Sequence, residues 1–445
     1  MPVERATRRA WLIWSTAVAI YFVSIFHRTS LGVAGLQAGE RFGVGAAGLG
    51  TFTVLQVGVY AAMQIPTGLL VDRFGPRRVL TVAALLLGLG QSLFAVASSY
   101  PLGLAARAVL GVGDALTWVS VLRLVAAHFP ARRYAVVVSL SGVLGAAGNL
   151  AATVPLTLML DNVGWTATFL TAGLVTAAYS ARAVTNLRDV PEGHPAPAPE
   201  PIYPREVVAR VRSSWRTPGT RLGFWVHFST NVVPSTLGLL WGFPYLVQAQ
   251  GLSQEAAGGV LSLLVVGGLV GSPLVGGFTA RRPELRMFVA TGFLSLTGAA
   301  WTLMVLWPGQ LPVPVLGAMF VLLSMGGPVS AIGFALARDY NPFRRVGTAT
   351  GVVNVGGFVA TTVAALSVGV LLDLAAPLGP AGAFRVALLA VAAVLVVGTW
   401  RTAVWWRRAR AVVFAAEARG EEVPVRLRPY RWDVLPSPRP ALAAA

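Results

Sequence analysis

Residues 68–78 read GLLVDRFGPRR, a short charged segment between two long apolar stretches of the sequence. These stretches cover residues 46–70 and 78–98. Each is long enough to cross the roughly 30 Å hydrocarbon layer, which takes about 20 apolar residues in a helix. The pattern predicts two membrane-spanning helices joined by a tight polar turn, and the same alternation continues in both directions along the chain.

The same reading of the whole sequence predicts an all-α polytopic membrane protein with 12 transmembrane helices in two pseudo-symmetric six-helix bundles. We expect an N-terminal segment over 1–10, a first bundle over 11–184, a linker over 185–220, a second bundle over 221–404 and a tail over 405–445. The predicted spans lie near 11–34, 46–70, 78–98, 101–126, 134–160, 165–184, 221–247, 254–279, 286–307, 312–337, 346–373 and 383–404.

The composition agrees with a membrane protein. Hydrophobic residues make up 55% of the 445 residues and charged residues 12%, and the mean hydropathy is +0.69. A soluble enzyme of this size would lack the polar residues to cover its surface. The chain has no cysteine, no histidine pair at metal-ligand spacing and no phosphate-binding GxxxxGK[ST] loop, so we expect no metal, no cofactor and no ATP-driven step.

The placement of the arginines predicts the orientation. The net charge is +18, every basic residue is arginine, and 29 of the 35 arginines fall in alternate polar segments. Because positive residues concentrate on the cytoplasmic side, both termini are predicted to be cytoplasmic, in a cell (inner) membrane. These arginines would face anionic lipid rather than nucleic acid. We expect a monomer whose partners are the bilayer, a small-molecule substrate and protons.

An internal repeat with an offset of 212 residues links the two halves. Pro130, Arg132 and Arg133 match Pro342, Arg344 and Arg345, and Val143 and Gly145 then match Val355 and Gly357. Two parallel six-helix halves favour a transporter with its binding site at the midplane between them. The alternative is that Pro-x-Arg-Arg is only a recurrent flank of cytoplasmic helix ends.

The charged segment resembles the loop 2–3 signature of the major facilitator superfamily, G-x-L-x-D-R-x-G-x-R-R. The residues that carry it are Gly68, Asp72, Arg73, Gly75, Arg77 and Arg78, and Arg107-x-x-x-Gly111-x-Gly113 resembles a second motif of that family. A cluster of Asp72 with neighbouring arginines could lock one conformation of the carrier and release it in the other. In the second half Ala280 or Arg281 replaces the acid, which argues against a symmetric gate.

Ionisable residues within the spans are candidates for function because charge is costly at bilayer depth. Arg28 and Arg107 each lie about six residues, so ~9 Å, from the outer end of their spans. Asp114 follows Arg107 by two helical turns, and a buried acid beside an arginine can take and release a proton. Alternatively Arg107 and Asp114 form a structural pair. Arg123, Arg182 and Arg385 are interpreted as snorkelling residues near helix ends.

A narrower resemblance to the anion:cation symporter branch rests on YFVSIFHRTSLGVA (21–34) and on the spacing of Arg107, Gly111, Asp114 and Ala115. The resemblance implies that Arg28 and Arg107 bind an organic anion and that Asp114 couples protons. Two departures matter. His27 stands where an acid often precedes the arginine, and it could bind substrate or titrate itself. Leu239 and Leu240 stand near the position where phosphate-ester carriers have a second arginine. Leucine in place of that arginine favours a monoanionic substrate.

Neutral polar residues could complete the pocket. Gln56, Tyr60 and Gln64 form one stripe on the second predicted span, and Asn354 lies within the eleventh. Gln56, Tyr60 and Asn354 are candidate substrate contacts, although such residues also join helices to one another. Asn149 and Asn231 have the same ambiguity, whereas Trp241 and Tyr245 are more typical of an interfacial aromatic belt.

Three functions fit these features unequally. The first is proton-coupled uptake of a small organic anion, such as a carboxylate or sugar acid, by alternating access. The alternative is a proton-driven multidrug or metabolite efflux carrier of the same superfamily, although two intramembrane arginines would repel cationic drugs. A membrane enzyme is disfavoured, because the outer loops offer only Glu40, Asp161 and scattered residues as acids.

Overall fold

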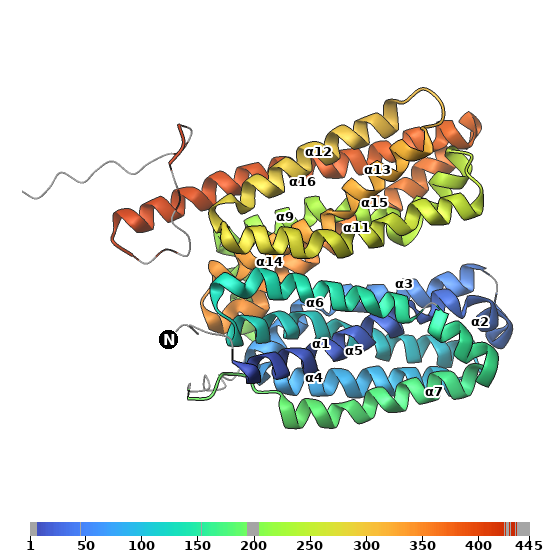
Figure 1. Ribbon diagram of the computed structural model, residues 1–445, viewed down its shortest axis with the longest axis horizontal. Helices are drawn as coiled ribbons and strands as arrows, with labels where there is room; N and C mark the ends of the chain where they lie inside the picture. Colours follow the sequence, from blue (N-terminus) through green and yellow to red (C-terminus); the bar gives the residue numbers. More distant parts are fainter. Residues whose placement is uncertain are drawn as a thin grey trace, which may run out of the picture. The chain divides into compact units, whose positions relative to one another are not determined.

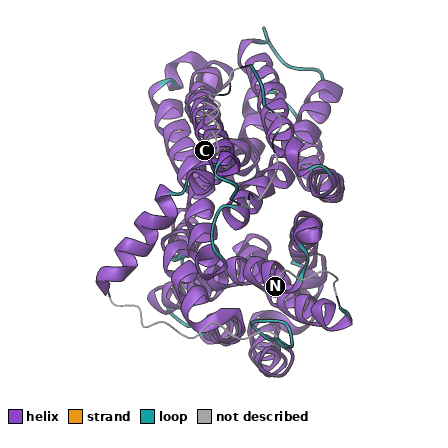
Figure 2. Ribbon diagram, turned by 90° about the vertical axis from the view of Figure 1, so that its left-hand side faces the viewer, coloured by secondary structure: helices purple, strands orange, loops and turns teal. Residues whose placement is uncertain are grey.

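The computed structural model describes residues 7–44, 46–152, 154–193 and 204–421, together with 423, 427, 429–431 and 433. All regular elements in these residues are helices (Figure 2). The chain divides into two compact units: residues 1–212 with 343–355, and residues 213–342 with 356–445. The first unit thus includes a short segment from far along the sequence.

The first unit is a bundle of long helices that run side by side (Figure 1). Its helices are α1 (Arg8–Val33), α2 (Gly35–Phe42), α3 (Ala46–Ala62), α4 (Gln64–Val96), α5 (Tyr100–His128), α6 (Ala131–Ala151) and α7 (Val154–Asn186). A cluster of aromatic rings around Phe94 packs one end of the bundle, including edge contacts with Phe52 and Phe169. Helix α5 is the most deeply buried of the apolar spans.

The second unit is a further helical bundle. It contains α9 (Pro218–Thr236), α10 (Gly242–Pro244), α11 (Gln254–Arg281), α12 (Arg286–Leu306), α13 (Val313–Ser324), α14 (Gly326–Asp339), most of α15 (Val346–Leu374) and α16 (Gly379–Ala418). Two π-helical turns, Leu237–Trp241 and Tyr245–Ala249, flank α10. Short 3-10 turns at Pro283–Leu285, Phe343–Arg345 and Ala376–Leu378 precede α12, α15 and α16.

Nine helices in the described residues are long and apolar enough to cross a membrane. The helices that carry most of spans two, six and seven, which are α3, α7 and α9, are not among these nine. Span two is split at Met63 into α3 and the start of α4, and α4 then continues through the turn at Gly75 into span three. Helix α7 continues through Gly164 in the same way, and π-helical turns interrupt span seven. The twelve-span fold is confirmed, with glycines of positive φ (78° and 75°) where the chain bends.

The repeat predicted from the sequence has a counterpart in packing. Gly145 of α6 lies against the Tyr21 ring of α1, where an added Cβ would clash. Gly357 of α15 lies against His227 of α9 in the same manner. In both units the helix that follows a Pro-x-Arg-Arg sequence therefore packs on the first helix of its bundle through a small residue.

The segments outside the bundles contain more helix than the sequence predicts. Helix α8 (Pro204–Arg216) occupies part of the expected linker. Helix α16 runs to Ala418, so the expected tail from residue 405 begins as fourteen further helical residues. Alanine and arginine, which are frequent in residues 405–418, are good helix formers.

Candidate functional site

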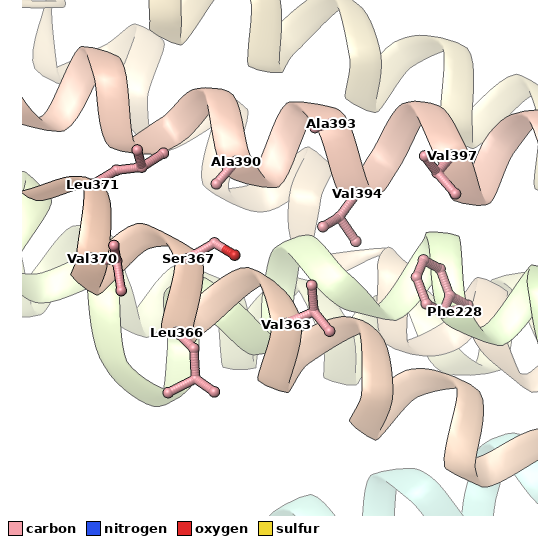
Figure 3. A pocket seen from close by; sticks show the side chains of 10 residues that line it. All are labelled: Phe228, Val363, Leu366, Ser367, Val370, Leu371, Ala390, Ala393, Val394 and Val397. Atoms are coloured by element: carbon pink, nitrogen blue, oxygen red, sulfur yellow. The ribbon is translucent and has the colours of Figure 1, made fainter.

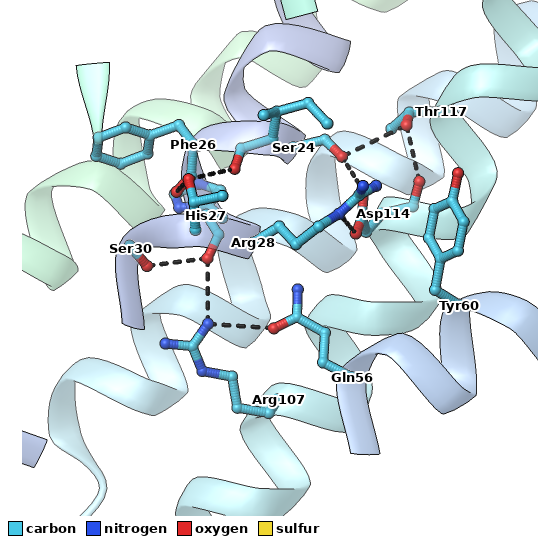
Figure 4. Close-up of polar contacts among 12 residues, drawn as sticks. Ser24, Phe26, His27, Arg28, Ser30, Gln56, Tyr60, Arg107, Asp114 and Thr117 are labelled. Carbon is cyan, nitrogen blue, oxygen red and sulfur yellow. Dashed lines mark hydrogen bonds and ion pairs between the residues drawn. The ribbon is translucent and has the colours of Figure 1, made fainter. Parts of the chain in front are cut away.

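An ion pair between α1 and α5 forms the centre of the candidate site (Figure 4). Arg28 donates from Nε to Oδ2 of Asp114 at 2.7 Å and from a terminal nitrogen to Oδ1 at 2.8 Å. The Asp114 side chain is 1% exposed and that of Arg28 is 28% exposed. The two-point geometry is the strongest arrangement that a guanidinium and a carboxylate can adopt.

Neighbouring side chains complete the surroundings of this pair. The Ser24 hydroxyl donates to Oδ1 of Asp114, and the Thr117 hydroxyl donates to the Asp114 carbonyl at 2.7 Å. The Tyr60 ring from α3 lies under the guanidinium of Arg28, 4.6 Å from its central carbon. Asp114 thus binds one edge of the Arg28 guanidinium, and the Tyr60 ring covers one of its faces.

Arg107 does not pair with Asp114, although the two share a helix face. Its guanidinium is completely buried and donates to the His27 carbonyl at 3.1 Å and to the Gln56 amide oxygen at 3.2 Å. It also lies 4.0 Å from the centre of the Phe94 ring. Nε and the second terminal nitrogen of Arg107 have no hydrogen-bond partner among the described residues. The structural pair that the sequence allowed for Arg107 and Asp114 is therefore replaced by an Arg28–Asp114 pair.

The His27 ring points away from this ion pair. Its Nε2 lies 2.9 Å from the Thr176 hydroxyl of α7, and that hydroxyl donates to the Ala172 carbonyl. His27 Nε2 must therefore carry the proton, which leaves Nδ1 as a buried nitrogen without a partner in the described residues. The His27 side chain therefore belongs to the contact between α1 and α7 and makes no printed contact with Arg28 or Asp114.

The polar stripe predicted on span two divides between two places. Gln56 contacts Arg107 and Tyr60 contacts Arg28, as described above. Gln64, at the start of α4, donates to the Tyr60 carbonyl at 3.0 Å and accepts from the Asn354 amide at 2.5 Å. Asn354 belongs to the part of α15 that lies with the first unit. These contacts place Asn354 next to Tyr60 but not on the Arg28–Asp114 pair itself.

The charged segment of the opening motif forms a second site. Asp72 accepts hydrogen bonds from the backbone nitrogens of Gly347 at 2.9 Å and Thr348 at 2.7 Å, and from the Thr348 hydroxyl at 2.6 Å. Asp72 thereby caps the first turn of α15, where unpaired N–H groups and the helix dipole favour an anion. Gly68 allows this approach, because a Cβ there would collide with the Gly347 backbone.

The arginine that faces Asp72 differs from the ones predicted. Arg123 of α5 is buried, 3.7 Å from the Asp72 carboxylate, and its guanidinium covers the Phe343 ring at 3.4 Å. Snorkelling was therefore the wrong interpretation of Arg123. The sequence contained a signal for this role, since an arginine within an apolar span needs a partner for its charge. Thr348 gave no comparable signal, because a threonine near a helix start is common.

The arginines of the motif itself have other partners. The backbone nitrogen of Arg77 donates to Asp189 at 2.7 Å, and its side chain donates to the Val184 carbonyl at 2.7 Å. Arg73 covers the Phe74 ring, and Arg78 is exposed. Gly75 has a φ of 78° and leaves room for the Asp189 carboxylate, which the sequence analysis did not single out. The motif therefore builds a turn as well as a cap.

The family model described as Major Facilitator Superfamily matches residues 17–327. The chain belongs to this superfamily. A protein named as a probable sulfoacetate transporter from Cupriavidus necator is 26% identical over 379 residues, which cover 81% of this chain and 87% of that protein. A probable galactarate/D-glucarate transporter of Escherichia coli is 26% identical over 406 residues, covering 83% and 90%.

The fold of this major facilitator protein matches solved structures as well. The Escherichia coli fucose:proton symporter aligns with a TM-score of 0.68 at 14% identity, over 88% of this chain and 99% of that one. Both resemblances that the sequence indicated, to the superfamily and to its organic-anion branch, are confirmed by these relatives. The protein is accordingly a membrane-spanning transporter of a small molecule.

Proposed function

We propose that this transporter couples the uptake of a small organic anion to protons. The observation that carries the proposal is the bidentate Arg28–Asp114 pair within the apolar helices of the first bundle. Asp114 is almost completely covered, whereas Arg28 keeps 28% of its side chain exposed. The guanidinium therefore has an accessible side on which a second anion can bind.

Competition for Arg28 would provide the coupling. Asp114 occupies two donor nitrogens of Arg28, which are the groups that a substrate carboxylate would also use. A proton on Asp114 removes its charge, weakens the pair and frees the guanidinium. Proton and anion then favour each other's binding, and linkage makes this effect reciprocal. Release of the proton on the other side restores the pair and expels the substrate.

The charges around the site support an anionic substrate. Arg107 adds a second buried positive charge with two nitrogens that lack partners among the described residues. Two guanidinium groups against one carboxylate leave a net positive site, which disfavours cationic drugs. The names of the relatives, transporters of sulfoacetate and of galactarate or glucarate, support small organic acids as the class. Leu239 and Leu240 in span seven support a monoanion over a phosphate ester.

Alternating access would use the cap on α15. While Asp72 holds the Gly347 and Thr348 nitrogens, the start of α15 is fixed to the first bundle. We propose that this cap breaks and re-forms in each transport cycle, with Arg123 compensating Asp72 when the cap is broken. The arginine distribution supports cytoplasmic termini and hence a cytoplasmic position for this gate.

The test is uptake into proteoliposomes with an imposed proton gradient, using sugar acids and sulfoacetate as labelled probes. Uptake should follow an inward proton gradient in the native protein. Asp114→Asn should keep counterflow exchange but lose the gradient dependence, because it mimics the protonated acid. Asp161→Asn, which changes an exposed acid near the end of another helix, is the matched control. Uptake that ignores the gradient, or an unchanged gradient dependence in Asp114→Asn, would reject proton coupling at this site.

A further inference from the structure

An apolar groove lies within the second unit between α15 and α16, with α9 at its floor (Figure 3). Its volume is about 650 Å³. Val363 and Leu366 form one wall, Val394 and Val397 the other, and Phe228 closes one end. Among the described residues that line it, Ser367 is the single polar side chain. A lining of this kind offers no anchor for a hydrophilic substrate, and it is suited to a hydrocarbon chain.

The rim of the groove is exposed. Leu366 is 67% exposed, Val370 59% and Val397 47%. Apolar side chains exposed to this extent within membrane spans are suited to contact with lipid. The open side of the groove is therefore suited to face the bilayer.

A group of arginines and tryptophans continues the groove beyond Phe228. Arg401 follows Val397 by four residues on α16, so both project from one face of the helix, about 6 Å apart along its axis. The Arg401 guanidinium lies 5.2 Å from the Trp225 ring, and that ring packs on Phe228 at 5.0 Å. An unbroken series of contacts thus joins the groove to a cation.

The other cations of this group lie on the same end of the bundle. Arg221 covers the rings of Trp215 and Trp405, and Arg408 also lies over Trp405, at 4.7 Å. Arg216, Arg401 and Arg408 are all near enough to repel Arg221 electrostatically. Tryptophan and arginine together are typical of the boundary between hydrocarbon and headgroups.

These four arginines have no carboxylate partner among the described residues. Other arginines in the described residues of this unit do form ion pairs, such as Arg286 with Asp339 and Arg410 with Asp433. An anion with several oxygens would stabilise Arg221 together with the three arginines that repel it, since these groups have no carboxylate partner in the described part of the chain. The Nε of Arg221 is occupied by the Trp215 carbonyl, which leaves its terminal nitrogens for such an anion.

We propose that the α15–α16 groove and the arginine group bind one anionic phospholipid, with an acyl chain in the groove and the phosphate on Arg401 and Arg221. The apolar lining selects the chain, and the uncompensated charge selects an anionic over a zwitterionic headgroup. This site is separate from the Arg28–Asp114 site and does not depend on the transported substrate.

The test measures lipid binding to the purified full-length protein after delipidation in detergent. Native mass spectrometry and thermal stability are recorded with phosphatidylglycerol, with phosphatidylcholine of the same chains, and with glycerol 3-phosphate, which has no chains. Phosphatidylglycerol should be retained and should raise the melting temperature, and the other two should do so much less. Equal effects of the two lipids would overturn the role of the arginines. An equal effect of glycerol 3-phosphate would show a site for a soluble anion and overturn the lipid.

Variants locate the site. Arg221→Gln with Arg401→Gln should weaken phosphatidylglycerol binding by about tenfold or more, since a lost charge-assisted contact of about 1.4 kcal/mol corresponds to tenfold. Arg133→Gln with Arg281→Gln removes the same charge from exposed positions outside the group and should change little. Ala393→Phe should fill the groove and lower retention, and Ala403→Phe, exposed on the same helix, should not. Equal loss in test and control variants would assign the binding to general surface charge.

Discussion

The two bundles place their ion pairs in different parts of their helices. In the first bundle, Arg28 and Asp114 meet between α1 and α5, within the apolar spans. In the described residues of the second bundle, ion pairs occur at helix ends, such as Arg286 with Asp339, or link α16 to the chain beyond it, such as Arg410 with Asp433. The positions 212 residues after Arg28, Arg107 and Asp114 are Leu240, Met319 and Gly326.

This difference indicates that the two halves of the repeat have different functions. Charge within an apolar span is costly, so it persists where function needs it. Charge at a helix end stays near water and costs little. The first bundle therefore carries the ionisable groups proposed for binding and coupling. The second bundle uses close backbone packing at the matching place, since Gly326 lies against the Thr230 carbonyl and Pro234.

The largest effect is expected from breaking the buried pair. Arg28→Ala leaves Asp114 buried without its cation, which should lower the free energy of unfolding by about 3–5 kcal/mol. Uptake should fall by about 100-fold or more, because the substrate loses its proposed ligand. Thermal unfolding and proteoliposome uptake measure the two effects.

The matched change in the second bundle is Leu240→Ala, at the position equivalent to Arg28. Leu240 is 54% exposed, so this variant should lose little stability. The double variant Arg28→Leu with Asp114→Leu should recover stability but not uptake. Recovery of uptake in the double variant would contradict the division between the bundles.

The second prediction concerns Gly326, which replaces Asp114 in the repeat. Gly326→Ala should destabilise the protein by about 1–3 kcal/mol, because its Cβ would meet the Thr230 backbone. Gly327→Ala has open space around its Cβ and should be neutral or slightly stabilising. Chemical or thermal unfolding of both variants gives the comparison. A similar loss in both would mean that helix propensity, rather than packing, decides the effect.

The third prediction concerns the Asp72 cap. Asp72→Ala removes the acceptor of three hydrogen bonds from Gly347 and Thr348 and should cost about 1–2 kcal/mol locally. The Gly347 and Thr348 amides should then exchange hydrogen for deuterium faster by about one order of magnitude, consistent with that energy. Arg281→Ala, at one of the two positions that the sequence analysis matches to Asp72, is the control. Unchanged exchange in Asp72→Ala would exclude the cap as a gate element.

The smallest effect concerns the ion pair between Arg410 of α16 and Asp433, which lies beyond the end of that helix. The hydrogen bonds from Arg410 hold the pKa of Asp433 below its ordinary value, and the Tyr430 nitrogen adds a further hydrogen bond at 2.7 Å. A lowered pKa means that this contact is fully present above the ordinary pKa of aspartate and is lost as the pH falls through the lowered value.

Hydrogen exchange of the Tyr430 amide, corrected for its intrinsic rate, measures this contact. Protection should be constant from neutral pH down to about pH 4 and should decrease below it. Asp433→Asn should show weak protection at all pH values, and Glu421→Gln should behave as the native protein. Loss of protection near pH 6 would assign the contact to another group.

Most of the fold could be predicted from the sequence, and the candidate site only in part. The residues Arg28, Asp114 and Tyr60 stood out because charge and polarity are conspicuous in an apolar span, and Asp72 stood out by its motif. The ion-pair partner of Asp114 could not be predicted from the sequence, because Arg107 shares its helix face and Arg28 lies 86 residues away. Separation along the sequence also prevented two further predictions. These are Arg123 as the cation beside Asp72, and the capping of the start of α15, which begins about 275 residues after Asp72.

The fold class, the approximate spans and the family follow from the sequence alone. These depend on the length and spacing of apolar stretches and on a local motif, which are properties of the chain before it folds. The tertiary structure decided which charges meet, that His27 turns to Thr176, and that four arginines and an apolar groove come together. Side-chain pairing depends on helix rotation and packing, and these are fixed when distant helices come into contact.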